Sequence, residues 1–192
     1  TKASAIDAPC VALAINSPGG SPAQSSLITS RIRQLAEEKE RPVIGFVEDV
    51  AASGGYWLAM AADEIFAAAT SIVGSIGVIS ASFGFTELLE KVGVERRVHT
   101  AGTSKSILDP FRPEQEKDVA ILRAVQDDIH AAFVDIVKLR RGERLADDPD
   151  IFSGQFWSGT SALGLGLIAG IGSPRQILHE RYGKKARIRP IS

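Results

Sequence analysis

Cysteine, histidine and surplus charge of either sign are scarce in this 192-residue chain. The single cysteine, Cys10, cannot form an internal disulfide and excludes a multi-cysteine zinc site. The three histidines (His99, His130 and His179) lack the spacing of a histidine metal cage. With 22 Lys+Arg against 23 Asp+Glu the net charge is −1, whereas nucleic-acid binding needs clustered surplus cations. We therefore expect no metal, no cofactor and no nucleic-acid partner.

Long apolar runs are also missing. Two stretches lack charged residues, Ile65–Thr86 and Ile151–Pro174, but glycines interrupt both. Neither supplies the roughly 20 predominantly apolar residues of a membrane-spanning helix. The chain begins at Thr1 without the features of a signal peptide. We predict no membrane span within these residues, and an anchor upstream of Thr1 stays open.

The chain has the composition of a globular α/β protein, with 44% hydrophobic and 23% charged residues. Short apolar runs alternate with amphipathic stretches, a pattern typical of βαβ units and a largely parallel sheet. We predict a helix capped by Ser21, with its apolar stripe at Leu27, Ile28, Ile32, Leu35 and Ala36. The other expected strands and helices are strands at 11–15, 43–47, 65–67 and 95–99, and helices at 56–62, 85–92, 114–141 and 174–182.

Two glycine-rich turns follow strands and precede helices: Ser17-Pro-Gly-Gly20 and Ala52-Ser-Gly-Gly55. Such a turn presents free backbone N–H groups at a helix N-terminus, where an anion is favoured. Neither turn has the pattern of a P-loop or of GxGxxG, so a nucleotide phosphate fits poorly. Each turn alone is explained as well by local structure, because Pro-Gly is common in type II turns.

Ser53 is the candidate nucleophile, since its small neighbours would let a substrate carbonyl approach the hydroxyl. A serine at this place also commonly caps a helix. A nucleophilic serine needs a base, and none of the three histidines is well placed for that role. A lysine can replace histidine if desolvation lowers its pKa. Lys105 lies in the small-residue loop 101–108 and fits this role, although an exposed loop lysine is the simpler interpretation.

Several motifs in a fixed order resemble one enzyme family. They are Asn16-Ser-Pro-Gly-Gly20, Ala51-Ala-Ser-Gly-Gly-Tyr56, Gly74-Ser-Ile-Gly-Val78, Lys105 with Asp109-Pro110, and the late segment Trp157–Leu167. This set resembles the signal peptide peptidase A family, peptidase family S49, whose members are Ser-Lys serine peptidases. The resemblance runs from about Val11 to Tyr182.

The resemblance implies a ClpP/crotonase-type α/β fold of repeated ββα units with a long C-terminal helical arm. It implies one peptidase domain over residues 1–192 that lacks its first strands. Carried over to matching positions, Ser53 is the nucleophile and Lys105 the general base, and the amides of Gly20 and Gly54 form the oxyanion hole. The substrate peptide would lie along Gly74, Ser75, Ile76, Gly77 and Val78.

The resemblance also implies partners and a location. Substrates would be short apolar peptides such as signal-peptide remnants, and the chain would associate into a closed homo-oligomer larger than a dimer. The protein would be membrane-associated or extracytoplasmic, as in the periplasm, with membrane association through a segment upstream of Thr1. No cofactor is implied.

Two other interpretations stay open. A ClpP-like Ser-His-Asp protease would need a histidine about 25 residues after the serine, and residues 76–79 contain none. A crotonase-type acyl-CoA enzyme, or an inactive protein with this fold, would keep the glycine turns. The Ser-Gly-Gly turn with its matched lysine fits an acyl-CoA enzyme poorly.

Overall fold

The computed structural model describes residues 8–191, which divide into two units. The first unit holds the described residues up to Gly77 and those from Ala132 onward, and the second holds Val78–Ala131. Each unit is described by itself below. The prediction of one peptidase domain over the chain stays a prediction.

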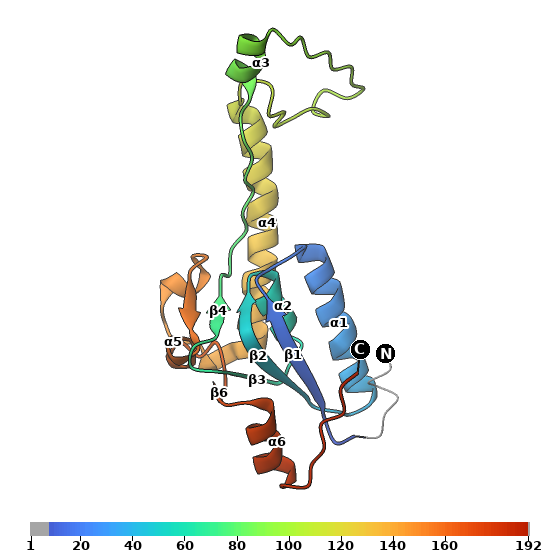
Figure 1. The fold of residues 1–192 in the computed structure, drawn as a ribbon, viewed down its shortest axis with the longest axis vertical. Helices are drawn as coiled ribbons and strands as arrows, with labels where there is room; N and C mark the ends of the chain where they lie inside the picture. The colour runs from blue at the N-terminus through green and yellow to red at the C-terminus, as the bar shows by residue number, and fades with distance from the viewer. Residues whose placement is uncertain (1–7, 192) are drawn as a thin grey trace. The chain divides into compact units, whose positions relative to one another are not determined.

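A six-stranded sheet forms the frame of the first unit (Figure 1). Its strands are β1 (Val11–Ser17), β2 (Val43–Ala52), β3 (Glu64–Ala67), β4 (Ile72–Gly74), β5 (Phe156–Ser158) and β6 (Gly170–Ile171). The order is β5-β4-β2-β3-β6, with β1 paired to β2. All pairs are parallel except β4 with β5, which confirms the predicted largely parallel sheet.

The central strand β2 is buried on both faces along its first half, as expected for a parallel strand covered by helices. Its register against β1 shifts: Ile15 pairs with Val47, but Ser17 pairs with Ala51. This irregularity bends the end of the sheet that leads into Ser53. The unit is therefore a mixed α/β structure with a curled sheet, while the repeated ββα units stay a prediction.

Helices cover both faces of the sheet. Alternate side chains of a strand point to opposite faces, so one strand contributes to two cores. Val43 and Val47 of β2 belong to a large core with Tyr56 and Phe133, and Ile44 and Phe46 belong to a smaller one. The helices on the larger core are α1 (Pro22–Glu38), α2 (Gly54–Ala59), α5 (Gly159–Gly164) and the C-terminal part of α4 (Glu116–Arg141). Helix α6 (Pro174–Tyr182) covers the smaller one, and 3-10 turns lie at Gly142–Arg144 and Pro149–Phe152.

The face that α1 buries follows the prediction at its C-terminal end, where Ala36 is buried and Ile32 packs against the core, and differs from it in the first half. Leu27 and Ile28 were expected in the core, but they are 64% and 46% exposed. The buried residues of this helix are Ser25, Thr29 and Ala36. The helix therefore packs through small and hydroxyl-bearing side chains, which let it approach α2 closely.

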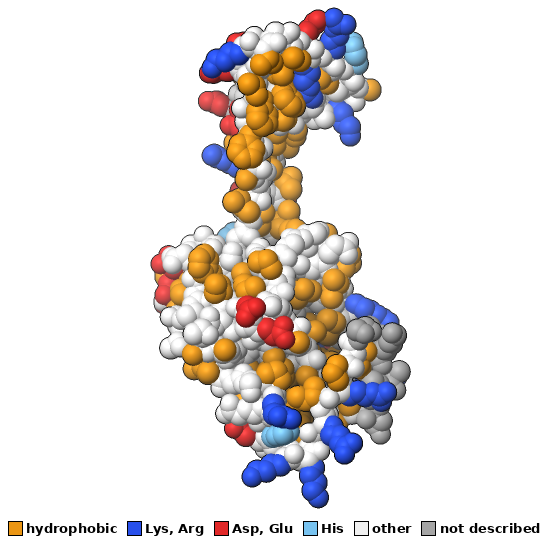
Figure 2. All heavy atoms as spheres, viewed as in Figure 1, with side chains coloured by type: hydrophobic (Ala, Val, Ile, Leu, Met, Phe, Trp, Pro, Cys, Tyr) orange, Lys and Arg blue, Asp and Glu red, His pale blue; other side chains and the backbone are white. Residues whose placement is uncertain are grey.

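The second unit contains α3 (Thr86–Val92), the first part of α4 and several turns. The strand expected at residues 95–99 is wrong, because this segment is irregular. An apolar alternation makes a strand only where a neighbouring strand accepts its hydrogen bonds. Large apolar side chains are exposed on this unit, among them Ile79, Phe83 and Val92 (Figure 2). In the part of the chain that the structure describes, no helix is long and apolar enough to span a membrane.

Candidate active site

The two glycine-rich turns, which stand 35 residues apart in sequence, meet in the folded chain. Parallel pairing of β1 with β2 brings the ends of both strands to the same edge of the sheet. A Cβ placed on Gly19 would lie 3.5 Å from the Cβ of Ser53 and 3.7 Å from its Oγ. The structure thus brings the predicted nucleophile against the predicted oxyanion turn.

Glycine is required where the turns touch. A Cβ on Gly54 would lie 3.1 Å from the Gly20 nitrogen, and a Cβ on Gly55 would collide with the carbonyl oxygen of Ser17. The second glycine of this pair therefore permits the close approach of the two backbones. The Gly-Gly sequence serves the packing of the site rather than chain flexibility.

Ser53 adopts a backbone conformation that L-residues rarely occupy. Its φ is 52° and its ψ is −125°, at the point where β2 ends and α2 begins. A residue held there costs on the order of 1–3 kcal/mol, and such residues cluster at functional sites. A sharp strand-to-helix turn of this kind exposes a serine hydroxyl at the edge of a sheet.

The Ser53 hydroxyl does not cap α2. The residue occupies the N-cap position, yet its side chain makes no capping hydrogen bond. By contrast, the Ser21 hydroxyl accepts from the Gln24 N–H and caps α1, as the sequence predicted. The helix-capping explanation of Ser53 is therefore wrong, and its hydroxyl is available for chemistry.

Two backbone N–H groups beside Ser53 are free to bind an anion. Among the described residues, no group accepts a hydrogen bond from the N–H of Gly20 or of Gly54. Gly54 is buried and stands at the first position of α2, where the N–H has no partner within the helix. A buried donor without a partner at this position is suited to an oxyanion.

The segment after β4 passes next to the nucleophile. The Ser53 N–H donates to the Gly74 carbonyl at 2.8 Å, and Ser75, with a φ of 54°, donates its N–H to the Gln155 carbonyl at 2.6 Å. The Ile76 side chain is fully buried in the core, so only its backbone could face a peptide. Val78 belongs to the second unit. Peptide binding along these residues stays a prediction.

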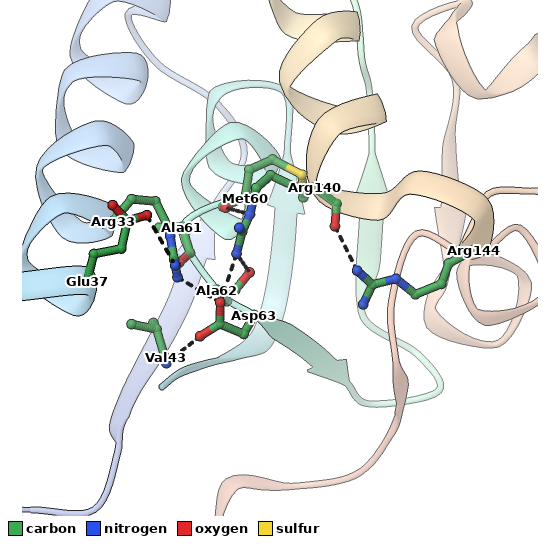
Figure 3. Close-up of polar contacts among 9 residues, drawn as sticks. All are labelled: Arg33, Glu37, Val43, Met60, Ala61, Ala62, Asp63, Arg140 and Arg144. Carbon is green, nitrogen blue, oxygen red and sulfur yellow. Dashed lines mark hydrogen bonds and ion pairs between the residues drawn. The ribbon is translucent and has the colours of Figure 1, made fainter. Parts of the chain in front are cut away.

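Arginines from two other helices hold the far end of α2 (Figure 3). Arg140 donates from Nε to the Met60 carbonyl and from Nη2 to the Ala62 carbonyl, at 3.0 and 2.9 Å. Arg33 donates from Nη1 to the Ala61 carbonyl at 3.2 Å. These cations satisfy carbonyls that a helix end leaves without partners. They thereby fix the helix that begins at Ser53.

Asp63 binds both arginines. Its Oδ1 lies 2.8 Å from Nη1 of Arg33 and 3.0 Å from Nη2 of Arg140, and its Oδ2 accepts from the Val43 N–H at 2.9 Å. Partial burial raises the pKa of Asp63, but the Val43 N–H and the two guanidinium groups lower it by more, so the pKa lies below its usual value. Asp63 therefore stays ionised and joins α1, α4 and the end of α2.

Tyr56 ties α2 to the late segment. Its hydroxyl donates to the Leu167 carbonyl at 2.7 Å in the core, and burial raises the pKa of this phenol. Nearby, Arg141 is buried and donates from Nε to the Gly166 carbonyl at 2.8 Å. The segment Trp157–Leu167 thus supports the nucleophile helix from behind.

Lys105 lies in the second unit, on an exposed turn. The neighbouring Asp109 carboxylate pairs with Arg96 and Arg112, and its Oδ1 accepts from the Phe111 N–H. Loss of water raises the pKa of Asp109, but these partners, Arg96 first, lower it by more. Arg96 and Arg112 thus bind the carboxylate of Asp109, which lies four residues after Lys105 in sequence. Ser53 and Lys105 belong to different units, and their pairing stays a prediction.

The sequence located Ser53 and the glycine turns but missed the arginines that hold α2. Arg33 and Arg140 lie more than 100 residues apart in sequence, and only the fold reveals that both reach the same helix end. Asp63 lies directly before β3, and a carboxylate next to a buried strand needs cationic partners. This position in the sequence could therefore have predicted that arginines bind there.

Comparison with known proteins identifies relatives. The chain is 60% identical over 184 residues to a protein of Brucella abortus named Na(+)/H(+) antiporter NhaA, covering 96% of this chain and 25% of that protein. It is 35% identical over 159 residues to the chloroplastic serine protease SPPA of Arabidopsis thaliana, covering 82% and 23%. It is 34% identical over 165 residues to a putative protease of Synechocystis, covering 86% and 59%.

The chain spans between about a quarter and three fifths of these relatives. The antiporter name describes a whole protein of which the matching part is one quarter. Residues 35–186 match peptidase family S49, and this range includes both Ser53 and Lys105. The chain therefore belongs to peptidase family S49.

Proposed function

We propose that this chain is a serine peptidase that cleaves short apolar peptides with Ser53 as nucleophile and Lys105 as general base. The observation that carries the proposal is the Ser53 turn: a strained serine whose hydroxyl does not cap α2 lies against a glycine turn whose Gly20 N–H has no acceptor among the described residues. Family membership supports a peptidase reaction. A ClpP/crotonase-type fold agrees with the mixed α/β structure and its curled sheet.

The reaction is an acyl transfer to water. The neutral amine of Lys105 accepts the Ser53 proton while Oγ attacks the peptide carbonyl carbon. The Gly20 and Gly54 N–H groups bind the negative oxygen, and one such donor is worth about 3–4 kcal/mol in the transition state. The resulting ammonium gives its proton to the leaving amine, and the C–N bond breaks. Water, deprotonated in the same way, then hydrolyses the acyl-enzyme.

Signal-peptide remnants are the proposed substrates, and the proposed place of action is at the membrane or outside the cytoplasm. Both proposals rest on the resemblance to signal peptide peptidases. The residues that flank Ser53 in sequence, Ala51, Ala52, Gly54 and Gly55, carry no charge. An apolar peptide suits such surroundings.

The Ser53→Ala variant tests the proposal. It should lose hydrolysis of an apolar peptide ester, because no other group replaces the attacking oxygen, and its free energy of unfolding should change by about 1 kcal/mol or less. Ser30→Ala, on the exposed face of α1, removes an equivalent hydroxyl and should leave turnover unchanged. Full turnover in a well-folded Ser53→Ala variant would reject Ser53 as nucleophile and favour an inactive or differently acting protein.

A further inference from the structure

A buried hydroxyl on α1 lies beside the two glycines of the proposed oxyanion hole. Ser25 is only 6% exposed. The position that a Cβ on Gly54 would occupy is 2.7 Å from the Ser25 Oγ and 3.1 Å from the Gly20 nitrogen. The hydroxyl therefore contacts the nucleophile turn at the place where the oxyanion turn also meets it.

Thr29, one helical turn further along the same face of α1, has a plain structural role. Its Oγ1 donates to the Trp57 carbonyl at 3.0 Å and ties α1 to α2. The Ser25 hydroxyl makes no hydrogen bond to any residue that the structure describes. Its oxygen is also not sealed from solvent. Two hydroxyls thus face α2, and only the one beside Gly54 is unpaired.

Stability does not explain a serine at this position. The Ser25 hydroxyl makes no hydrogen bond to a described residue, so replacement by alanine would lose no such bond. Alanine also has the higher helix propensity. A residue whose polar group adds no stability, placed against a reaction site, indicates a functional role.

We propose that Ser25 is a positioning residue of this reaction, and the inference rests on the proposed function. Its Oγ sets how closely the first turn of α1, and the Gly19–Gly20 turn before it, approaches Gly54. Two amide donors stabilise one oxyanion only if both lie about 2.7–3.1 Å from that oxygen. Without the Ser25 Oγ the two turns shift against each other, and the donors no longer converge.

The Ser25→Ala variant tests this role with a peptide ester as substrate. We expect kcat to fall about 10- to 100-fold, because small displacements of oxyanion donors have large effects on rate. KM should stay within about twofold, and the thermal midpoint should be equal or higher. Ser30→Ala on the exposed face of the same helix is the matched control and should change none of the three.

Several results would overturn the inference. An unchanged kcat in Ser25→Ala, a loss confined to KM, or a lowered thermal midpoint with proportionate loss of activity would each show that Ser25 is not a positioning residue. The Ser53→Ala variant separates this failure from that of the proposed function. If Ser53→Ala is inactive and Ser25→Ala is not impaired, the peptidase proposal is supported and the positioning role of Ser25 is rejected. If Ser53→Ala is active, both the peptidase proposal and the role of Ser25 are rejected.

Discussion

Ser53 combines an unfavourable backbone conformation with a hydroxyl that makes no capping bond. The tight contacts of Gly54 and Gly55 with the 17–20 turn hold it in place. The sequence Ala-Ala-Ser-Gly-Gly predicted room for a substrate carbonyl beside the Ser53 hydroxyl but not the positive φ. Backbone strain of this kind depends on contacts with residues far away in sequence, so composition cannot reveal it.

The Lys105→Arg variant tests the proposed base. Arginine keeps the positive charge but stays protonated, so it cannot accept the serine proton. We expect peptide ester hydrolysis to fall by at least about 100-fold, the usual scale of general base catalysis.

Lys91→Arg supplies the control for this experiment. Lys91 is an exposed lysine on α3 in the same unit, paired at 4.0 Å with Glu87. Its replacement should leave the rate of ester hydrolysis unchanged. If Lys105→Arg hydrolyses the ester at a rate near that of the wild type, the lysine has a binding or structural role and the Ser-Lys mechanism is wrong.

At the scale of elements, the cap of α1 was predictable, and the packing face of the first half of that helix was not. Ser21 caps α1, as the sequence predicted, and Gly93 in a left-handed conformation ends α3. The exposed Leu27 shows the limit of hydrophobic periodicity. Close packing of α1 on α2 selects Ser25 and Thr29 instead, because small side chains let the two helices approach.

The Asp63→Asn variant tests whether the arginine cluster stabilises the fold. The pKa of Asp63 is lowered in the folded state, so its contribution is complete above the ordinary value of about 3.9 and is lost as pH falls through the folded value. Asp63 is partly exposed, and solvent screening reduces the effect. We expect the free energy of unfolding at pH 7 to fall by about 1 kcal/mol.

Urea unfolding of Asp63→Asn and wild type at neutral pH and at about pH 2 measures this contribution, and the difference between them should vanish in acid. Glu37→Gln is the control, since the Glu37 side chain is exposed and its loss should change stability by less than about 0.5 kcal/mol. A difference of equal size at both pH values would show that the carboxylate charge is not what stabilises the cluster.

At the scale of the whole molecule, we expect a closed homo-oligomer larger than a dimer. Exposed apolar side chains on the second unit, including Ile79 at 88% and Phe83 at 78%, are typical of an interaction surface. Light scattering at micromolar concentration should give a mass above twice the 20.4 kDa of one chain. Phe83→Ser should lower that mass, whereas Leu139→Ser, an equally exposed position in the first unit, should not.

A monomer mass at every micromolar concentration would contradict this prediction. The resemblance to the peptidase family predicts assembly into such an oligomer. In an oligomer, Lys105 of one copy can serve Ser53 of another. Ser53 and Lys105 belong to different units. A dyad within one chain and a dyad between two chains both stay predictions.

Labelling with a fluorophosphonate tests the central claim most directly. Such a reagent phosphonylates an activated serine: the serine oxygen bonds to phosphorus and fluoride leaves, whereas ordinary hydroxyls stay unmodified. Mass spectrometry of the digested wild-type chain should locate one adduct on Ser53, with none on Ser17 or Ser25, and Ser53→Ala should take up no label. An adduct at another serine, or an unlabelled but well-folded wild-type chain, would contradict the assignment of Ser53 as the nucleophile.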